Sequence, residues 1–357
     1  MRRTAALIAG AGPAGCAAAI RLAAGGMRPL VVERSEGPRD MVCGGFLGWD
    51  ALESLRRLGL DPERLGARPI ARLRLVTARG VLETRLPRLA AGLSRRTLDT
   101  ALQAAAAAAG AELLHGRSIR AADRERRLLR LEDGEELAGE ALLIATGKHE
   151  LRGAERGAAI STAPLGLRAA VRGAADLDGV IELHLFNGGY SGALTQEDGT
   201  TNLCLSVSRA RLKAAGGIEP LLAELASELP ALGRRLEGGP LGEWSAIAGV
   251  PYGWRARATS PAIYRVGDQA AVIASLAGDG VAIALESGMA AADALLSGKG
   301  SAGFQAAFAA RAARPLGVAE RLRWAAEHGP SRALLMPALR LFPGLARIGA
   351  RLTRIGG

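Results

Sequence analysis

The chain has few of the residues that usually carry metal or thiol chemistry. It contains three cysteines and four histidines in 357 residues. Cys16, Cys43 and Cys204 form no CxxC pair and the histidines are scattered, so the sequence predicts neither a structural zinc site nor an acid–base dyad. We expect reduced thiols in a cytoplasmic protein.

Long uncharged apolar stretches are also missing. None reaches the ~18 residues of a membrane-spanning helix. The best candidates are interrupted by Asp279 or by glycine and proline. A spanning helix is therefore not expected.

Acidic residues are scarce near the C-terminus. The formal net charge is +11, and the last 47 residues carry nine arginines against two glutamates, so most of the excess lies in this tail. No recognised nucleic-acid motif or interleaved aromatic surface accompanies the arginines, and no nucleic-acid partner is expected.

What the chain does have is a glycine pattern near its start. The segment MRRTAALIAGAGPAGCAAAIRL contains GxGxxG at Gly10, Gly12 and Gly15. Two arginines before an uncharged stretch are also typical of a leader, but signal-peptide cores rarely combine several glycines with a proline. Residues 5–9 predict a buried strand, residues 13–24 a helix, and PLVVE a second strand, which together make a βαβ unit.

The spacing within this unit favours a dinucleotide site. Glu33 falls eighteen residues after Gly15, close to the ~20 expected for an acid that accepts hydrogen bonds from an adenosine ribose. Gly10 allows the tight turn, Gly12 lets the backbone approach a pyrophosphate, and Gly15 lets helix and strand pack closely. The helix N-terminus would add N–H donors and partial positive charge.

The rest of the chain alternates between predicted helices and strands. Ser94 and Gly110 are the expected N-cap and stop of one helix, and ALLIATG has the composition of a central strand. Between about residues 165 and 253, strand-like pieces surround one predicted helix at 218–229. A glycine-bearing loop then opens a long helix near Gly280.

Three segments carry a resemblance to a known family. They are the N-terminal glycine pattern, the VGD and GDG segments of YRVGDQAAVIASLAGDGVAIALESG, and CGG at residues 43–45. Over nearly its whole length the chain resembles the FAD-dependent oxidoreductases of the p-hydroxybenzoate hydroxylase superfamily, in their geranylgeranyl-reductase-like branch.

The resemblance implies FAD bound in an extended pose. Arg95 would lie near the flavin phosphates and ribityl chain, Asp268 would accept a hydrogen bond from a ribityl hydroxyl, and Cys43 would pass beside the isoalloxazine. Cys43 is the candidate catalytic residue, with an inert small hydrophobe as the alternative. The implied cofactor-binding residues are Gly10, Gly12, Pro13, Ala14, Gly15, Glu33, Arg34, Cys43, Gly44, Gly45, Arg95, Thr146, Gly147, Gly267, Asp268, Gly278, Gly280 and Val281.

The expected fold is α/β, with a Rossmann-like FAD-binding domain, an inserted sheet-rich substrate domain and a helical C-terminal tail. We assign residues 1–69, 91–164 and 255–300 to the first domain, 70–90 and 165–254 to the second, and 301–357 to the tail.

Two departures from the family pattern bear on the reaction. Relatives usually carry Asp-Gly after the central strand, in a motif linked to NADPH, whereas this strand ends in ATGKHELRG. NAD(P)H is a candidate electron donor, but the sequence does not carry the Asp-Gly motif that would support its use. The GWxWxIP motif of the flavin-dependent halogenases is also missing, because PYGWRARA does not match it.

The expected substrate is a hydrophobic small molecule. The inserted domain supplies Tyr190, Trp244 and Tyr252, and the loop expected beside the flavin supplies Phe46 and Trp49, so these five aromatics are the candidate pocket. Their alternative role is to fill the core.

The tail has a helical spacing of Leu341, Leu345, Ile348, Leu352 and Ile355, with Arg340, Arg347, Arg351 and Arg354 largely on another face. Such a helix either packs on the protein's own core or makes a peripheral contact with an anionic membrane.

Three functions follow from these features. The favoured hypothesis is a monooxygenase of a hydrophobic aromatic or polyketide-like molecule. The alternatives are a reductase of prenyl double bonds and a flavin-bearing sensor without turnover. The sequence does not separate them, because FAD supports hydride transfer, oxygen activation and alkene reduction alike.

Overall fold

The N-terminal glycine pattern lies in a βαβ unit, as the sequence predicts. The computed structural model describes residues 2–157 and 163–356. Strand β1 (Arg2–Ala9) leads through the glycine turn into helix α1 (Pro13–Ala24), and β2 (Leu30–Val32) returns parallel to β1. The last four residues of β1 are buried, which explains their uniformly apolar composition.

This unit belongs to a seven-stranded sheet with the order β6-β2-β1-β9-β8-β7, to which β15 adds by pairing with β9. Strand β9 (Glu136–Ile144), which contains the predicted central strand, pairs in parallel with β1 and β15 and antiparallel with β8. The other strands are β6 (Glu112–Leu114), β7 (Ile119–Asp123), β8 (Leu128–Leu131) and β15 (Ile263–Arg265).

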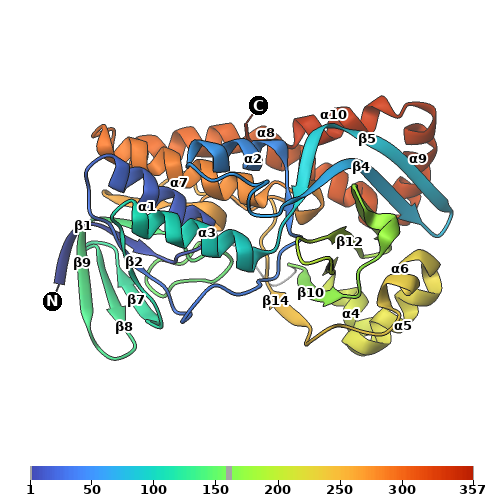
Figure 1. Cartoon of the computed structure of the whole chain (residues 1–357), viewed down its shortest axis with the longest axis horizontal. Coiled ribbons are helices and arrows are strands. Elements are labelled where there is room, and N and C mark those ends of the chain that lie inside the picture. Colours follow the sequence, from blue (N-terminus) through green and yellow to red (C-terminus); the bar gives the residue numbers. More distant parts are fainter. Residues whose placement is uncertain (1, 158–162, 357) are drawn as a thin grey trace.

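Helices cover one face of this sheet (Figure 1). They are α1, α3 (Arg95–Ala108) and α7 (Gly280–Leu296), while α2 (Trp49–Arg57) packs on α7 and on β5 (Gly80–Gly92) of a second sheet. Ser94 caps α3 by accepting a hydrogen bond from the Thr97 amide at 3.1 Å, so the predicted N-cap is confirmed. Successive side chains along the strands point to opposite faces of the sheet. Those on one face pack in a core with these helices, and those on the other face pack in a second core with β7 and β8.

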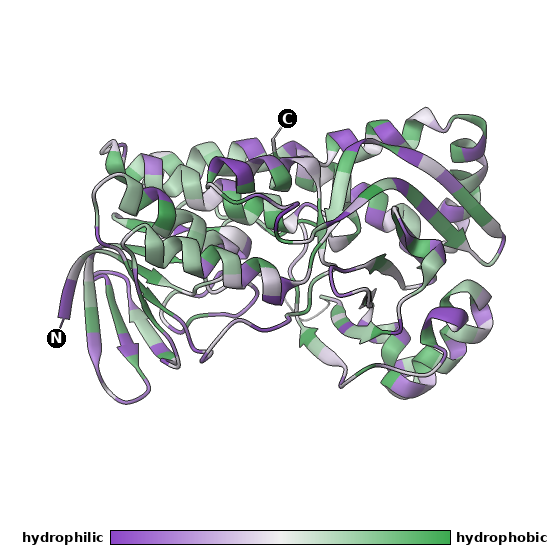
Figure 2. Ribbon diagram, viewed as in Figure 1, coloured by the Kyte–Doolittle hydropathy of each residue, from purple (hydrophilic) through white to green (hydrophobic). Residues whose placement is uncertain are grey.

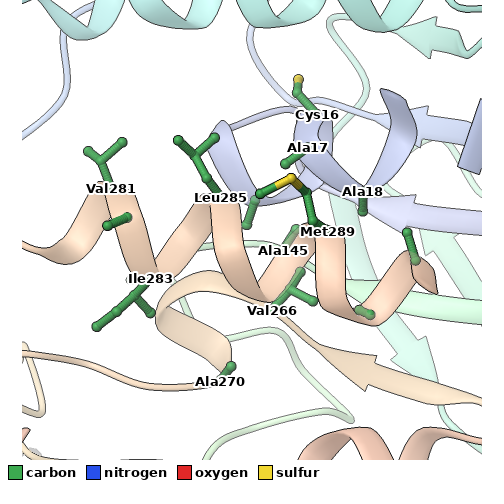
Figure 3. Close-up of a cluster of buried hydrophobic side chains, with 14 of the residues drawn as sticks. Cys16, Ala17, Ala18, Ala145, Val266, Ala270, Val281, Ile283, Leu285 and Met289 are labelled. Atoms are coloured by element: carbon green, nitrogen blue, oxygen red, sulfur yellow. The ribbon is translucent and has the colours of Figure 1, made fainter. Parts of the chain in front are cut away.

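Helices α1 and α7 cross at very short range, with small residues at the contact. A side chain on Gly288 of α7 would overlap the carbonyl oxygen of Ala14 in α1. Ala17 and Ala18 lie on the same side of α1, and Leu285 and Met289 of α7 pack beside them (Figure 3). The alanine-rich composition of α1 is thus explained by a helix that packs directly on a second helix.

A second sheet has eight strands in the order β14-β10-β13-β12-β11-β4-β5-β3. The long hairpin of β4 (Arg68–Thr77) and β5 (Gly80–Gly92) joins strands that come a hundred residues later. Those strands are β10 (Leu165–Val171), β11 (Val180–Phe186), β12 (Gly189–Thr195), β13 (Thr201–Val207) and β14 (Ser245–Ala248), while β3 (Phe46–Leu47) adds to the edge. Short 3₁₀ turns lie at Ala175–Leu177, Gly267–Gln269 and Ser275–Ala277.

The helices beside this sheet differ from the prediction. We expected one helix at 218–229, and the structure has three: α4 (Arg209–Ala215), α5 (Ile218–Glu228) and α6 (Pro230–Leu236). Their short length hides the 3.6-residue periodicity in the sequence, and Gly216 and Pro230 divide them. The fold class itself, α/β with a second sheet-rich part and a helical C-terminal region, is confirmed.

The C-terminal region is helical but is not the single amphipathic helix that the spacing suggests. It consists of α8 (Ser301–Glu327), α9 (Gly329–Leu341) and α10 (Gly344–Leu352). The break falls at Phe342, whose backbone is non-helical (φ −130°, ψ 74°), as is favoured for a residue that precedes a proline. Figure 2 shows hydrophobic and hydrophilic residues side by side on these helices. In the part of the chain that the structure describes, no single helix has the length and apolar composition of a membrane span, and one bent pair, α9 with α10, meets the criteria together at 114°.

Candidate cofactor and substrate site

One extended cavity of about 890 Å³ runs from the glycine turn at α1 to the C-terminal helices. Most of the predicted cofactor residues line it: Gly10, Gly12, Pro13, Ala14, Glu33, Arg34, Cys43, Gly44, Arg95, Thr146, Gly147, Gly267, Asp268, Gly278, Gly280 and Val281. Gly15 and Gly45 lie outside the lining. The topology therefore brings segments more than two hundred residues apart to a common space.

The turn before α1 is shaped for a pyrophosphate. Gly12 is the N-cap of α1 and makes no side-chain cap, so the first N–H groups of the helix are not satisfied by a capping side chain. Gly10 has φ +109°, and a Cβ there would lie 2.6 Å from the Ala145 carbonyl oxygen. Gly15 lies beneath the turn, where a Cβ would overlap the Gly10 carbonyl oxygen. These contacts fit the three separate tasks that the sequence assigns to the glycines.

Glu33 is held at the end of β2 by the backbone. Its two carboxylate oxygens accept hydrogen bonds from the Ala11 amide at 2.9 Å and the Ser35 amide at 3.0 Å. Each oxygen keeps a further lone pair for a ribose hydroxyl. Next to it, Arg34 Nη2 lies 2.9 Å from His149 Nε2, which closes this end of the cavity.

Arg95 stands at the start of α3 and is fixed by a two-pronged ion pair. Its Nε and Nη2 atoms donate to Asp99 at 3.0 and 2.7 Å. A Cβ on Gly12 would lie 3.7 Å from Arg95 Nη2, so the guanidinium is beside the pyrophosphate turn. This placement suits a planar cation that recognises phosphate oxygens.

Asp268 follows β15 and lines the cavity near the glycine turn, since a Cβ on the preceding Gly267 would lie 3.0 Å from Ala14 Cβ. The Arg156 guanidinium donates to the Asp268 carbonyl oxygen at 3.2 Å, and the Gly267 amide donates to Ser287 Oγ at 2.7 Å. The Asp268 carboxylate lies 3.5 Å from Lys148 Nζ and raises the pKa of that lysine. Lys148, which sequence reasoning missed, is part of ATGKHELRG, where the family pattern has Asp-Gly.

The N-terminus of α7 faces the same space, again without a capping side chain. Gly280 and Val281 line the cavity, and Gly278 precedes them with φ +66°. The Asp279 carboxylate points away from its own helix and accepts a hydrogen bond from Arg354 Nη1 at 2.9 Å. Two helix N-termini without capping side chains open onto one cavity, which fits a cofactor with a central pyrophosphate and an electron-accepting ring.

Arg354 is the functional residue that the sequence placed wrongly. We expected it on the polar face of an amphipathic tail, but its side chain is only 4% exposed. Its guanidinium donates to the Gly278 carbonyl oxygen at 3.2 Å and lies 4.6 Å from the ring centroid of Trp49. The Ile355 amide also donates to Asp279, at 2.8 Å, so the chain end docks on the start of α7.

The loop of Cys43 runs along the cavity wall. Asn202 Nδ2 donates to the Cys43 carbonyl oxygen at 3.0 Å, which anchors the loop to β13. Cys43 and Gly44 face the cavity, whereas Gly45 (φ +68°) packs against Gln196 and the Leu93 carbonyl. The thiol is partly exposed, so both interpretations of Cys43, contact residue and inert filler, stay open.

The structure brings three of the five aromatics of the predicted pocket to the cavity. Phe46, Tyr190 and Tyr252 line the cavity. Trp49 and Trp244 do not: Trp49 is buried beneath Arg354, and Trp244 packs on the core between the second sheet and α5. An apolar sequence position does not distinguish a cavity wall from a filled core, which is why the prediction was wrong for these two.

A cluster of three hydroxyl groups, those of Ser275, Tyr190 and Tyr252, lies on the cavity wall. Ser275 Oγ lies 2.6 Å from Tyr190 Oη and 2.8 Å from Tyr252 Oη, and Tyr190 Oη accepts a hydrogen bond from the Leu276 amide at 3.2 Å. Burial raises the pKa of Tyr190 well above its ordinary value of 10.0, so the phenol stays protonated at neutral pH.

Beyond these hydroxyls the wall is aliphatic. Alternate residues of the paired strands β4 and β11 point to it, and α9 supplies the opposite side. The leucines are Leu73, Leu75, Leu183, Leu185, Leu335 and Leu339. Sequence reasoning missed them, although the two-residue spacing within each strand was a usable signal.

The fold and this cavity define a flavoprotein. The FAD binding domain family matches residues 3–140, which include the glycine turn, Glu33 and Arg95. The chain therefore has an FAD-binding domain, as expected, and it is an FAD-dependent oxidoreductase.

Comparison with known proteins extends the likeness beyond the FAD-binding domain. A menaquinone reductase of Mycobacterium tuberculosis is 28% identical over 98% of this chain and 88% of its own length. Among solved structures, the flavin-dependent brominase Bmp2 has TM-score 0.80 at 17% identity, covering 98% of this chain and 93% of that one. A geranylgeranyl bacteriochlorophyll reductase-like protein of Thermoplasma acidophilum has TM-score 0.74 at 19% identity, covering 92% and 87%.

We predict that Asp268→Ala weakens FAD binding by roughly tenfold to a hundredfold, because the loss of a charged acceptor costs about 1.5–3 kcal/mol. The readout is the flavin absorbance retained after gel filtration, with Asp293→Ala as the matched control. Asp293 of α7 lies outside the cavity lining and forms an exposed ion pair with Arg21 of α1. Full flavin occupancy in Asp268→Ala would contradict the assignment.

Proposed function

We propose that this FAD-dependent oxidoreductase reduces a carbon–carbon double bond in the isoprenoid chain of a hydrophobic substrate. The observation that carries the proposal is the aliphatic wall of the cavity. Leucines of β4, β11 and α9 line the space beyond the hydroxyl cluster, and they offer contact to a branched aliphatic chain rather than stacking to a planar ring.

The relatives support the same substrate class. The relative that spans almost the whole chain is a menaquinone reductase, and one similar fold is that of a geranylgeranyl bacteriochlorophyll reductase-like protein. Menaquinone and geranylgeranyl groups share an isoprenoid chain. A lipid quinone therefore fits the proposal better than a small polar molecule.

The residues divide the work of the reaction. When bound and reduced, FAD supplies a hydride for one carbon of the double bond. The other carbon requires a proton, and we assign its delivery to the hydroxyl cluster of Tyr190, Tyr252 and Ser275, whose hydrogen-bonded hydroxyls can relay a proton. The leucine wall excludes water and holds the chain in position.

A monooxygenase of an aromatic molecule is the second candidate. Phe46 and Tyr252 line the part of the cavity near Gly278 and Ser275, where a ring would find aromatic contacts. The solved structure of Pseudomonas aeruginosa PqsL in complex with 2-aminobenzoylacetate has the same fold, with TM-score 0.73 at 18% identity.

Anaerobic turnover separates the two candidates. The protein is reduced with dithionite, or with NADH and NADPH separately, and mixed with menaquinone in detergent under nitrogen. We expect a product two hydrogens heavier in its isoprenoid chain by mass spectrometry. A product that forms only in air and is one oxygen heavier would overturn the proposal in favour of the monooxygenase.

A pair of variants in the cavity wall tests whether the substrate enters the aliphatic space. Gly192 of β12 lines the cavity, and a Cβ there would lie 3.4 Å from Leu183, an ordinary contact. We predict that Gly192→Leu fills the aliphatic space, keeps FAD and lowers turnover at least tenfold, while Gly192→Ala changes turnover little. Equal turnover in all three proteins would show that substrate does not enter this space.

A further inference from the structure

The outer sides of α9 and α10 expose large apolar side chains at the bend between the two helices. Leu334, Leu341, Phe342, Leu345 and Ile348 have between 45% and 77% of their surface exposed. We call these five residues the elbow surface. An exposed group of this kind on adjacent turns marks a site of interaction rather than ordinary surface variation.

The segment that carries the elbow surface has charges of one sign. From His328 to the end of the sequence the chain contains no aspartate or glutamate. Arg340, Arg347 and Arg351 are interleaved with the apolar residues and are exposed. Apolar side chains surrounded by arginines fit a surface that is apolar inside and anionic outside.

The inner sides of the same helices line the cavity. Leu335 and Leu339 of α9 and Ala346 and Ala350 of α10 line it, and Leu345, although 45% exposed, reaches the lining as well. Helices α9 and α10 thus separate the cavity from the exterior. A lipid held at the elbow surface would lie one helix diameter from the aliphatic wall.

We propose that the elbow surface docks this protein on an anionic lipid bilayer, with Phe342 and its neighbours in the interfacial layer and the arginines at the headgroups. The inference depends on exposure and charge, not on turnover, so it stands apart from the proposed function. The contact is peripheral, because the inner sides of both helices are occupied by packing on the protein and by the cavity.

Vesicle flotation tests the proposal on the full-length flavoprotein. We expect wild type to float with vesicles of phosphatidylcholine and phosphatidylglycerol in equal amounts, to stay in solution with phosphatidylcholine alone, and to detach as salt rises. Failure to float with the anionic vesicles would overturn the proposal.

Two sets of variants locate the contact. Leu341→Ser with Phe342→Ser is expected to reduce binding at least tenfold, and each of Arg340→Gln, Arg347→Gln and Arg351→Gln about fivefold, from the ~1 kcal/mol that each basic residue contributes near an anionic surface. The matched controls are Leu241→Ser, which alters an apolar residue that is 60% exposed in the sheet-rich part, and Arg64→Gln, whose side chain is 88% exposed on the loop after α2.

The controls decide between a specific surface and a general effect. Undiminished binding by the Leu341/Phe342 variant, or an equal loss in the controls, would overturn the proposal. Light scattering without lipid adds a further test: a dimer of the wild type that the Leu341/Phe342 variant loses would identify a second copy of the chain as the occupant instead. FAD occupancy is measured in every variant to confirm that the fold is retained.

Discussion

Gly15→Ala is expected to abolish FAD retention and to lower the free energy of unfolding by about 3 kcal/mol or more. The added methyl group would overlap the Gly10 carbonyl oxygen and contact Ile8. The turn cannot move aside, because the Gly10 amide is bonded to the Val32 carbonyl at 2.8 Å and the Ala145 carbonyl closes the other side. Flavin absorbance after gel filtration and urea denaturation measure the two effects.

The matched control is Gly303→Ala in α8. Gly303 is exposed, and a Cβ there has no atom within 4 Å. This change should leave FAD in place and raise stability slightly, by about 0.5–1 kcal/mol, because alanine is the better helix former. If Gly15→Ala behaved like this control, α1 could not approach β1 as closely as the structure has it.

Arg354→Met is expected to cost about 3–5 kcal/mol of stability, since it leaves a buried carboxylate without its partner. Asp279 is 1% exposed and takes hydrogen bonds from Arg354 and from the Ile355 amide. With the counter-charge gone, the chain end should detach from α7 and FAD affinity should fall. Methionine keeps the length of the side chain, so the effect reports on charge.

The pH dependence of stability gives this prediction a second readout. Burial raises the pKa of Asp279 to about 6, against an ordinary value of 3.8, and Arg354 opposes that rise. The folded state therefore binds the proton more tightly than the unfolded chain, and this contribution to stability is complete below about pH 4 and is lost as pH rises to about 6. In Arg354→Met the pKa should rise further and the loss should extend to higher pH.

The double variant Asp279→Asn with Arg354→Met separates charge from shape. It removes both charges and should recover much of the stability, with a flatter profile in urea denaturation between pH 5 and 8. If Arg354→Met alone already matched the wild-type profile, the ion pair would not be what holds the chain end.

The N-terminal half of the site could be predicted from the sequence because its geometry is local. The turn of Gly10 and Gly12, the helix after it and Glu33 lie in one βαβ unit, where spacing along the chain sets spacing in space. Asp268 and Gly280 were placed through the family resemblance rather than through periodicity. The structure brings all of these residues to one cavity.

The rest of the site depends on contacts that periodicity does not encode. Leu73 and Leu183 become neighbours of one wall only because β4 and β11 pair across a hundred residues. Arg354 follows a helical spacing in the sequence, yet α10 ends at Leu352 and the buried Asp279 holds the arginine inside the protein. Trp49 and Trp244 were expected in the pocket but lie in the core, because aromatic residues near a site fill the core as readily as they line a cavity.

The crossing of α1 with α7 also governs when the molecule can form during its synthesis. The first βαβ unit is complete by Glu33, but its partner helix begins only at Gly280, after the whole second sheet has been made. Until then the small side chains around Ala17 and Ala18 have no cover. Cofactor loading should thus follow release of nearly the entire chain from the ribosome, and early truncation products should be insoluble and colourless.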